Sequence, residues 1–327
     1  MGKVKIAVGY AKKQQRKEER KRLGPIQNLI VGEASRKRYM KAVITLLTWL
    51  GRMYQSMPQD SYALDDALSA YIQTCWEEGE GRALIADTIA GMKYFKPHLK
   101  RALPLADRLS KAWQRNEIPA RAPPFTPLIA FAMAEKFFRQ QLGDMALGCL
   151  VMFFCILRTG ELAAVTVGDF HIAPDLTSFV LNLGATKGGK ILGVSESVSC
   201  ERPWLVKAVA AWKRNKLSGD ALISGGINKF RRLFSSHLRE LGLHDEGFKP
   251  YSLRRGGATF HFREGSSLSR TCVYGRWQSP KSARLYINDG LAVLASFNFP
   301  HAMKLLNPLA AQYLQRCNAP KRLVEKF

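Results

Sequence analysis

Apolar residues recur every three to four positions through the first third of the chain, a spacing that places them on one face of a helix. The clearest stretch runs from Tyr39 to Leu50, and similar stretches follow as far as Trp113, separated by glycines and prolines. Residues 25–117 are therefore predicted to form a small all-α domain of four short helices, with lysines and arginines interleaved among the apolar positions.

A proline-rich segment, residues 118–127, follows this domain and is predicted to be a linker, because its prolines remove backbone donors and disfavour helix. Residues 128–327 then mix helical periodicity with alternating patterns. The fold class predicted is mainly α with a small antiparallel β-sheet, a helical domain followed by a mixed α/β domain. Strands are predicted at 165–172, 179–183 and 191–194, the last two joined by a tight turn at Lys187-Gly188-Gly189-Lys190. Helices are predicted at 128–141, 145–157, 203–216, 227–241, 252–262, 268–274, 281–287 and 303–316.

Residues 1–24 form a basic tail that is predicted to be disordered. A nuclear import signal, an arm along DNA phosphates and a mitochondrial transit peptide are its functional interpretations. The most apolar run, Met145 to Leu157, is too short to span a bilayer and is predicted to be a buried helix. No secretory signal is recognised, so we expect a soluble intracellular protein, nuclear if its source is eukaryotic.

The balance of charged residues limits the classes of partner that the protein is expected to bind. Fifty lysines and arginines against 26 aspartates and glutamates give a formal net charge of +24. Such a field attracts a polyanion, most commonly nucleic acid. The six cysteines include no CxxC pair, so a zinc site is not expected and a reducing compartment fits. The chain has no P-loop motif, so we expect neither ATP nor another cofactor.

The last third of the chain carries the most informative pattern: YSLRRGGAT from Tyr251, GRW ending at Trp277, and ARLYI containing Tyr286. Trp277 and Tyr286 are nine residues apart, and residues 249–286 hold eight lysines and arginines but one acid. A second arginine-centred motif, ILRTGEL, begins at Ile156. Arginine meets phosphate with two parallel hydrogen bonds, a lysine can protonate a leaving oxygen, and a tyrosine can attack phosphorus and be released by the reverse reaction. Together these groups could form a covalent phosphotyrosine on DNA.

In their order and spacing, ILRTGEL, ATKGGK, YSLRRGGAT, GRW and ARLYI resemble the tyrosine recombinase and phage integrase family. The resemblance covers about residues 25–300. It implies that residues 25–117 are the family's DNA-binding core-binding domain, and that 128–327 are its catalytic domain with a C-terminal docking tail. Residues 303–314 could dock on a neighbouring protomer or pack on their own domain, and both alternatives stay open.

The resemblance also implies roles for individual residues. Arg158 and Arg254 match the two arginines that hold the scissile phosphate, and Glu161, three residues after Arg158, can orient its guanidinium. Trp277 matches the ring whose N–H bonds the phosphate. Tyr286 matches the nucleophile.

Three further positions are less settled. Lys187 best matches the catalytic lysine that protonates the leaving oxygen, with Lys190 as the alternative. Tyr251 stands where the family has His or Lys, and a phenol is a poor base near neutral pH. Contacts to DNA are expected from Lys190, Arg255, Arg276 and Arg284.

The function implied is a site-specific recombinase or integrase that cleaves and rejoins double-stranded DNA through a 3′-phosphotyrosyl intermediate, without metal or ATP, as a tetramer on DNA. A recombinase-derived protein that binds DNA without cutting is one alternative, kept open by Tyr251. A type IB topoisomerase, which shares the chemistry, is another. A basic structural or RNA-associated protein would explain the charge but not the motif spacing.

Overall fold

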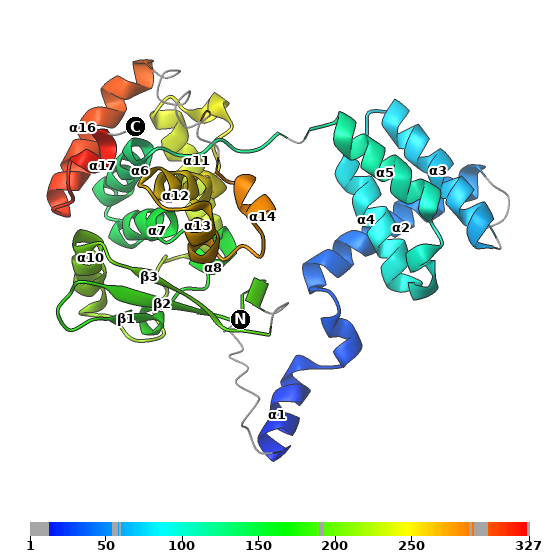
Figure 1. Cartoon of the computed structure of the whole chain (residues 1–327), viewed down its shortest axis with the longest axis horizontal. Coiled ribbons are helices and arrows are strands. Elements are labelled where there is room, and N and C mark those ends of the chain that lie inside the picture. Colours follow the sequence, from blue (N-terminus) through cyan, green and yellow to red (C-terminus); the bar gives the residue numbers. More distant parts are fainter. Residues whose placement is uncertain are drawn as a thin grey trace. The chain divides into compact units, whose positions relative to one another are not determined.

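The computed structural model describes residues 13–53, 58, 60–118, 120–186, 188–189, 193–287, 290 and 300–325. The chain forms two compact units that divide between residues 120 and 121, inside the predicted linker 118–127 (Figure 1). The end of that segment belongs to the second unit. There Phe125 is buried, and its backbone N–H donates to the carbonyl of Ser252.

The four predicted helices of the first unit are present as α2, α3, α4 and α5, and α2 is longer than expected. Their core is built on the apolar stripes, with Leu46, Leu68, Ile85 and Leu103 fully buried. The buried carboxylate of Asp65 accepts hydrogen bonds from the first backbone N–H groups of α5. The elements of this unit are η1 (Ile26–Leu29), α2 (Glu33–Met53), α3 (Ser61–Glu77), α4 (Arg82–Phe95), η2 (Pro97–Arg101) and α5 (Pro104–Asn116).

The prediction of a disordered tail is wrong for residues 13–23, which form helix α1 (Lys13–Leu23). Lysine, arginine, glutamine and glutamate are all good helix formers, and the side chains of Gln14 and Glu18 pair one turn apart. The first twelve residues lie outside the described part of the chain.

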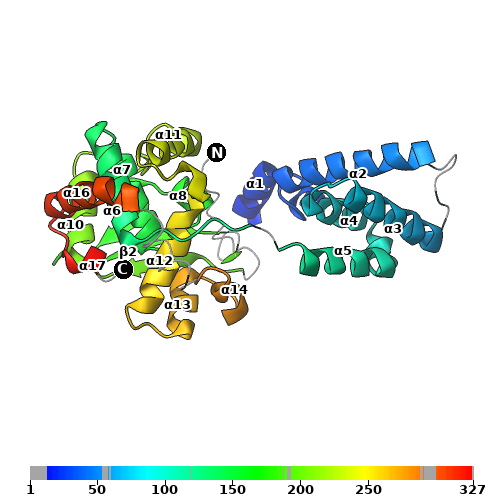
Figure 2. The same ribbon diagram turned by 90° about the horizontal axis from the view of Figure 1, so that it is seen from above.

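The second unit is helical with one small sheet, which confirms the predicted fold class (Figures 1 and 2). Helix α7 is apolar all round and buried, as predicted, and packs on α6 and α12. The helices of this unit are α6 (Pro127–Arg139), α7 (Gly143–Phe154), α8 (Thr159–Leu162), η3 (Val167–Asp169), α10 (Pro203–Lys213), α11 (Gly226–Glu240), η4 (His244–Glu246), α12 (Tyr251–Arg263), α13 (Leu268–Gly275), α14 (Pro280–Arg284), α16 (Pro300–Arg316) and α17 (Arg322–Glu325).

The sheet is antiparallel in the order β1 (Phe170–Ile172), β2 (Phe179–Gly184) and β3 (Glu196–Cys200). β1 is shorter than predicted, because the carboxylate of Asp169 caps a 3-10 turn just before it. Of the strand predicted at 191–194, residues 191 and 192 lie outside the described residues, residues 193 and 194 are not in a strand, and β2 pairs with residues 196–200. Its connection to β3 is correspondingly longer than a tight hairpin turn.

Two glycines of the YSLRRGGAT motif allow α12 to pack closely. A Cβ at Gly256 would overlap the backbone of Phe125, and one at Gly257 would overlap the carbonyl of Phe153. Only glycine permits such close backbone approach. The motif therefore brings α12 against α7 and fixes the position of Arg254, just upstream.

The C-terminal helix α16 packs on α6 of its own unit. Leu306, Ala310 and Tyr313 are buried there. Beside them Arg316 donates two hydrogen bonds to the buried carboxylate of Glu135. The tail thus packs on its own domain in this structure of a single chain, and docking on a neighbouring protomer stays a prediction. Within the described ranges, no helix combines the length and apolar character needed to cross a membrane.

Candidate active site

The first arginine motif lies where α7 ends and α8 begins. After α7 the backbone turns through Ile156, and Arg158 becomes the N-cap residue of α8. Glu161 accepts a hydrogen bond of 2.7 Å from the backbone N–H of Arg158 and forms an ion pair with its guanidinium. The predicted contact between residues three apart is present, and Arg158 remains a quarter exposed.

Arg254 lies on α12 and is fully buried. Its two Nη atoms donate to the carbonyl oxygens of Ile156 and Gly275. Its guanidinium carbon lies 4.7 Å from the ring centroid of Trp277. Burial, with the nearby cations Arg276 and Arg158, lowers the pKa of Arg254 to about 10, so the group stays charged near neutral pH.

A third arginine, Arg276, is buried beside these two, with its side chain 4% exposed. Its Nη2 donates to Glu161 Oε2 and to the carbonyl of Ile156, both at 2.9 Å. Its Nη1 donates to the carbonyls of Tyr274, at 3.1 Å, and Cys155, at 3.4 Å.

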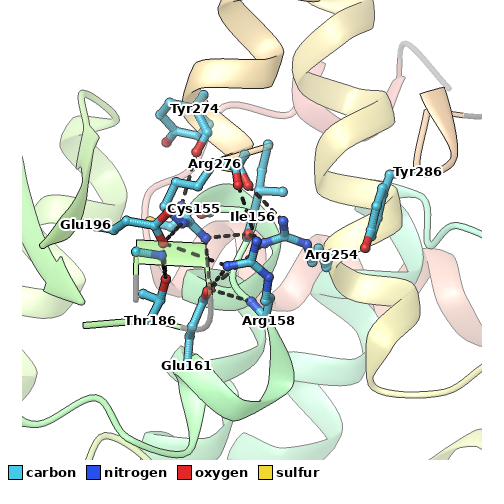
Figure 3. A network of polar contacts seen from close by, with 12 residues as sticks. Cys155, Ile156, Arg158, Glu161, Thr186, Glu196, Arg254, Tyr274, Arg276 and Tyr286 are labelled. Atoms are coloured by element: carbon cyan, nitrogen blue, oxygen red, sulfur yellow. Dashed lines mark hydrogen bonds and ion pairs between the residues drawn. The ribbon is translucent and has the colours of Figure 1, made fainter. Parts of the chain in front are cut away.

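Glu161 is the common anion of this arginine cluster, formed by Arg158, Arg254 and Arg276 (Figure 3). Burial would raise the pKa of its carboxyl, but the charge of Arg276 and the hydrogen bond and charge of Arg158 outweigh that effect, and the pKa is lowered. Glu161 therefore stays ionised and can hold the guanidinium groups in place.

A second carboxylate, Glu196 at the start of β3, lies at the edge of the arginine cluster. Its Oε2 is 3.8 Å from Arg158 Nη1 and 4.0 Å from Arg276 Nε. The same oxygen accepts a hydrogen bond from the hydroxyl of Thr186. Nothing in the local sequence pattern had singled out Glu196, because its neighbours in space come from distant segments.

The two tyrosines of the motifs, Tyr251 and Tyr286, contact each other close to Arg254. Tyr286 lies in the turn after α14, and its hydroxyl accepts a hydrogen bond of 2.5 Å from the hydroxyl of Tyr251. The ring of Tyr286 is centred 4.8 Å from that of Trp277 and 5.3 Å from the guanidinium carbon of Arg254. Figure 3 shows Tyr286 at the side of Arg254.

The two phenols differ in acidity. Burial and the hydrogen bond to Tyr286 raise the pKa of Tyr251, so it stays protonated. Burial also opposes ionisation of Tyr286, but the hydrogen bond from Tyr251, the charge of Arg254 and the nearby indole of Trp277 together lower its pKa. The arrangement therefore favours Tyr286 as the phenolate and Tyr251 as the donor that stabilises it.

The predicted lysines, Lys187 and Lys190, lie outside the described residues. The residues beside Lys187 do reach the site. A Cβ built on Gly188 would lie 3.8 Å from Arg158 Nη2 and 3.2 Å from Glu196 Oε1. The backbone of the glycine turn therefore comes close to the arginine cluster.

The predicted DNA contacts divide into two kinds. Arg284 is exposed on α14, as a phosphate contact requires. Arg255 and Arg276 are buried, like Arg254, and their predicted contacts with DNA stay predictions. Arg255 lies on the closely packed part of α12, and burial lowers its pKa. Arg276, which lies between Gly275 and Trp277 in the GRW motif, donates its hydrogen bonds to acceptors of the protein itself.

No family model and no curated protein sequence matches this chain. Several solved structures do. The Tn1549 transposon integrase in complex with transposon right end DNA has a TM-score of 0.56 and 12% identity, over 87% of this chain and 98% of that one. The XerH site-specific recombinase bound to a palindromic difH substrate has a TM-score of 0.54 and 15% identity, over 81% and 79%. A lambda integrase dimer bound to a COC′ core site has a TM-score of 0.53 and 14% identity, over 80% of this chain and 90% of that one.

These similarities extend through most of the chain. At this level of identity they establish the fold. The chain has the fold of the tyrosine recombinases.

Proposed function

We propose that this protein cleaves and rejoins duplex DNA through a phosphotyrosine at Tyr286, as a site-specific recombinase. The observation that carries the proposal is the hydrogen bond of 2.5 Å between Tyr251 and Tyr286 above the buried guanidinium of Arg254. Four separate motifs of a basic chain supply these groups and the arginine cluster. The solved structures of similar fold include complexes with transposon-end, difH and core-site DNA.

In the first step the Tyr286 oxygen attacks the scissile phosphorus, and the bond from phosphorus to the 5′-oxygen breaks. The nucleophile must first lose its proton. Tyr251 cannot take that proton, because it is a phenol with a raised pKa. Tyr286 instead ionises to solvent with its lowered pKa, and the hydrogen bond from Tyr251 stabilises the phenolate.

The negative charge that develops on the non-bridging phosphate oxygens must be stabilised by hydrogen-bond donors. The site contains donors that could take this role. Arg158 is partly exposed. The Nε of Arg254 is buried and has no hydrogen-bond partner within the described part of the chain. The buried Nε1 of Trp277 faces Tyr286, whose pKa it helps to lower. An unpaired buried donor is costly, so its presence beside Tyr286 supports a site built to receive an anion.

The leaving 5′-oxygen needs a proton, and we assign this role to Lys187, with Lys190 as the alternative. Support comes from the neighbouring Gly188, which lies close to Arg158. A 5′-hydroxyl from the partner strand then attacks the phosphotyrosine, the bond to Tyr286 breaks, and the same lysine takes the proton back. The phosphoester bond energy is kept in the protein link, so ligation needs no ATP.

The proposal is tested with a random library of nicked duplexes in EDTA, from which covalent adducts are trapped with SDS. Nicking lets a short leaving fragment diffuse away, so the intermediate accumulates. We expect adducts from the natural protein and none from Tyr286→Phe. Tyr274→Phe is the matched control, because Tyr274 is a nearby tyrosine whose hydroxyl donates to the carbonyl of Phe154 instead, and it should still form adducts.

One observation favours a second candidate, a DNA-binding protein that does not cut. Tyr251 is a phenol in the position where the resembled family has His or Lys, and it lacks the basicity of those groups. Tight DNA binding without adducts on any library member would favour this candidate. Where adducts form, joining of two sites supports a recombinase, while relaxation of supercoils without joining supports a topoisomerase.

Strand exchange between two duplexes would require several protomers on DNA, and we propose a tetramer. Lambda integrase, one of the proteins of similar fold, has been solved as a dimer on a core site and as a tetramer on a Holliday junction. Sedimentation of the protein with a synthetic four-way junction carrying its site tests this assembly.

A further inference from the structure

Two residues other than glycine adopt left-handed backbone conformations where the arginine cluster is assembled. Ile156 has φ of 50° and Arg276 has φ of 58°. A β-branched residue is rarely found there, and each such residue costs about 1–3 kcal/mol. Strain of this kind persists only where the surrounding contacts impose it. The contacts of the two residues should therefore explain why they are held this way.

The two strained residues are bonded to each other. The Ile156 carbonyl accepts from Arg276 Nη2 and also from Arg254 Nη1. The Arg276 carbonyl in turn accepts from Arg158 Nη2 at 3.3 Å. Each left-handed turn therefore directs a carbonyl toward a guanidinium that the proposed reaction uses.

The side chain of Arg276 completes this arrangement. It joins Glu161 of α8 to the backbone that follows α7 and to its own turn after α13. Its charge is the largest influence that keeps the Glu161 carboxyl ionised against burial. Lysine has a single charged nitrogen and could not reach these acceptors together.

We infer that Arg276 is a positioning residue for the phosphate-binding arginines, acting on Arg158 through Glu161 and on Arg254 through the Ile156 carbonyl. The inference rests on the proposed function. It assigns the buried guanidinium of Arg276 to the contacts that it makes within the protein, as an alternative to the predicted contact with DNA. Loss of the side chain should therefore reduce cleavage while leaving DNA affinity almost unchanged.

The test compares Arg276→Gln, Arg276→Lys and Arg276→Gly with Arg322→Gln, a matched loss of one exposed arginine on α17. Single-turnover adduct formation is measured on protein saturated with a nicked site, so that only folded, bound molecules are counted. We expect the rate to fall about 100-fold in Arg276→Gln and Arg276→Lys, the size of effect that a small misplacement of reacting groups produces. Binding should stay within about threefold, as expected when no phosphate contact is lost.

The glycine variant distinguishes the effect of losing the Arg276 side chain from the effect of disturbing the left-handed turn. Glycine adopts the left-handed conformation without strain, so Arg276→Gly should keep the turn and still lose the rate. The pH profile gives a further readout. The Glu161 pKa is lowered in the natural protein, and removal of Arg276 should raise it, moving the acid limb of the rate profile to higher pH.

The inference is overturned if Arg276→Gly or Arg276→Gln cleaves within twofold of the natural protein, or if the acid limb does not move. Ionisation of Glu161 in the DNA-free protein, followed by carboxyl carbon NMR, separates the two proposals. A protein that never forms an adduct refutes the proposed function. A Glu161 pKa that is unchanged by Arg276→Gln refutes the positioning role, whether or not the protein cuts DNA.

Discussion

The two units of this protein bury charge in different ways. In the helical unit Asp65 is 6% exposed, and its oxygens accept from the backbone N–H groups of Leu105 and Ala106 at 2.9 and 3.0 Å. It satisfies the first N–H groups of α5, and it forms no ion pair with a residue that the structure describes. In the other unit Glu161 is surrounded by three arginines whose donors are not all used. The first pattern stabilises a fold, and the second prepares a site for an anion.

Another buried carboxylate of the second unit, Glu135, gives a further comparison. Glu135 is 1% exposed, but its partners Arg139 and Arg316 are about half exposed. These arginines have water for their remaining donors, and they attach α16 to α6. A buried carboxylate is thus found both where it stabilises the fold and in the candidate active site. Burial of two of its arginines as well, Arg254 and Arg276, is what distinguishes the candidate active site.

The largest effect is expected from Arg254→Gln. It removes the guanidinium beside Tyr286, takes away the donor to the carbonyl of Gly275, and leaves the carbonyl of Ile156 with Arg276 as its side-chain donor. Adduct formation should fall about 1,000-fold, as for loss of a main transition-state donor. Unfolding free energy should also fall, by roughly 1–3 kcal/mol. Single-turnover assays and denaturant titration measure the two effects, and a rate within tenfold of the natural one contradicts the assigned role.

Asp65→Ala should show the opposite profile. Loss of the acceptor for two backbone N–H groups should lower the unfolding free energy of the helical unit by about 2 kcal/mol. The cleavage rate of protein saturated with DNA should not change. Asp65→Asn, which keeps one acceptor oxygen, should lose less stability. A lost cleavage rate at full DNA occupancy would refute the structural role given to this carboxylate.

Tyr251→Phe should have a smaller effect that depends on pH. The hydrogen bond from Tyr251 is the foremost of the influences that lower the Tyr286 pKa against burial. Removing it raises that pKa, so less phenolate is present at a given pH and the rate profile moves to higher pH. We expect about a tenfold loss near neutral pH that is recovered at alkaline pH. A profile that is lower but not displaced would mean that Tyr251 acts in another way.

The smallest effect is expected from Arg284→Gln. An exposed arginine that contacts a DNA phosphate contributes mainly through counterion release. The slope of log affinity against log salt should decrease by about one, with a loss of a few-fold in binding and no change in rate at saturation. Arg322→Gln is the control that should leave the slope unchanged. Equal slopes for both variants would argue that Arg284 does not contact DNA.

Much of the fold follows from local patterns. The uniformly apolar α7 and the stripes of α2 to α5 were predicted because each forms a continuous face or core segment. The third strand was misplaced. The apolar run at 191–194 is a stronger local signal than residues 196–200, where only Val198 and Cys200 are apolar and face the core. Pairing with β2 decided which segment became the strand.

The sequence by itself determined the fold class, the basic charge and the motifs that supply Arg158, Arg254, Trp277 and Tyr286. Residue identity and regular spacing carry that information. Only the tertiary structure decided the contacts that gather these residues. Arg276 is turned inward to Glu161, and Tyr251 donates to Tyr286. These contacts depend on left-handed turns and on segments more than 100 residues apart in the case of Arg276, which no local pattern specifies.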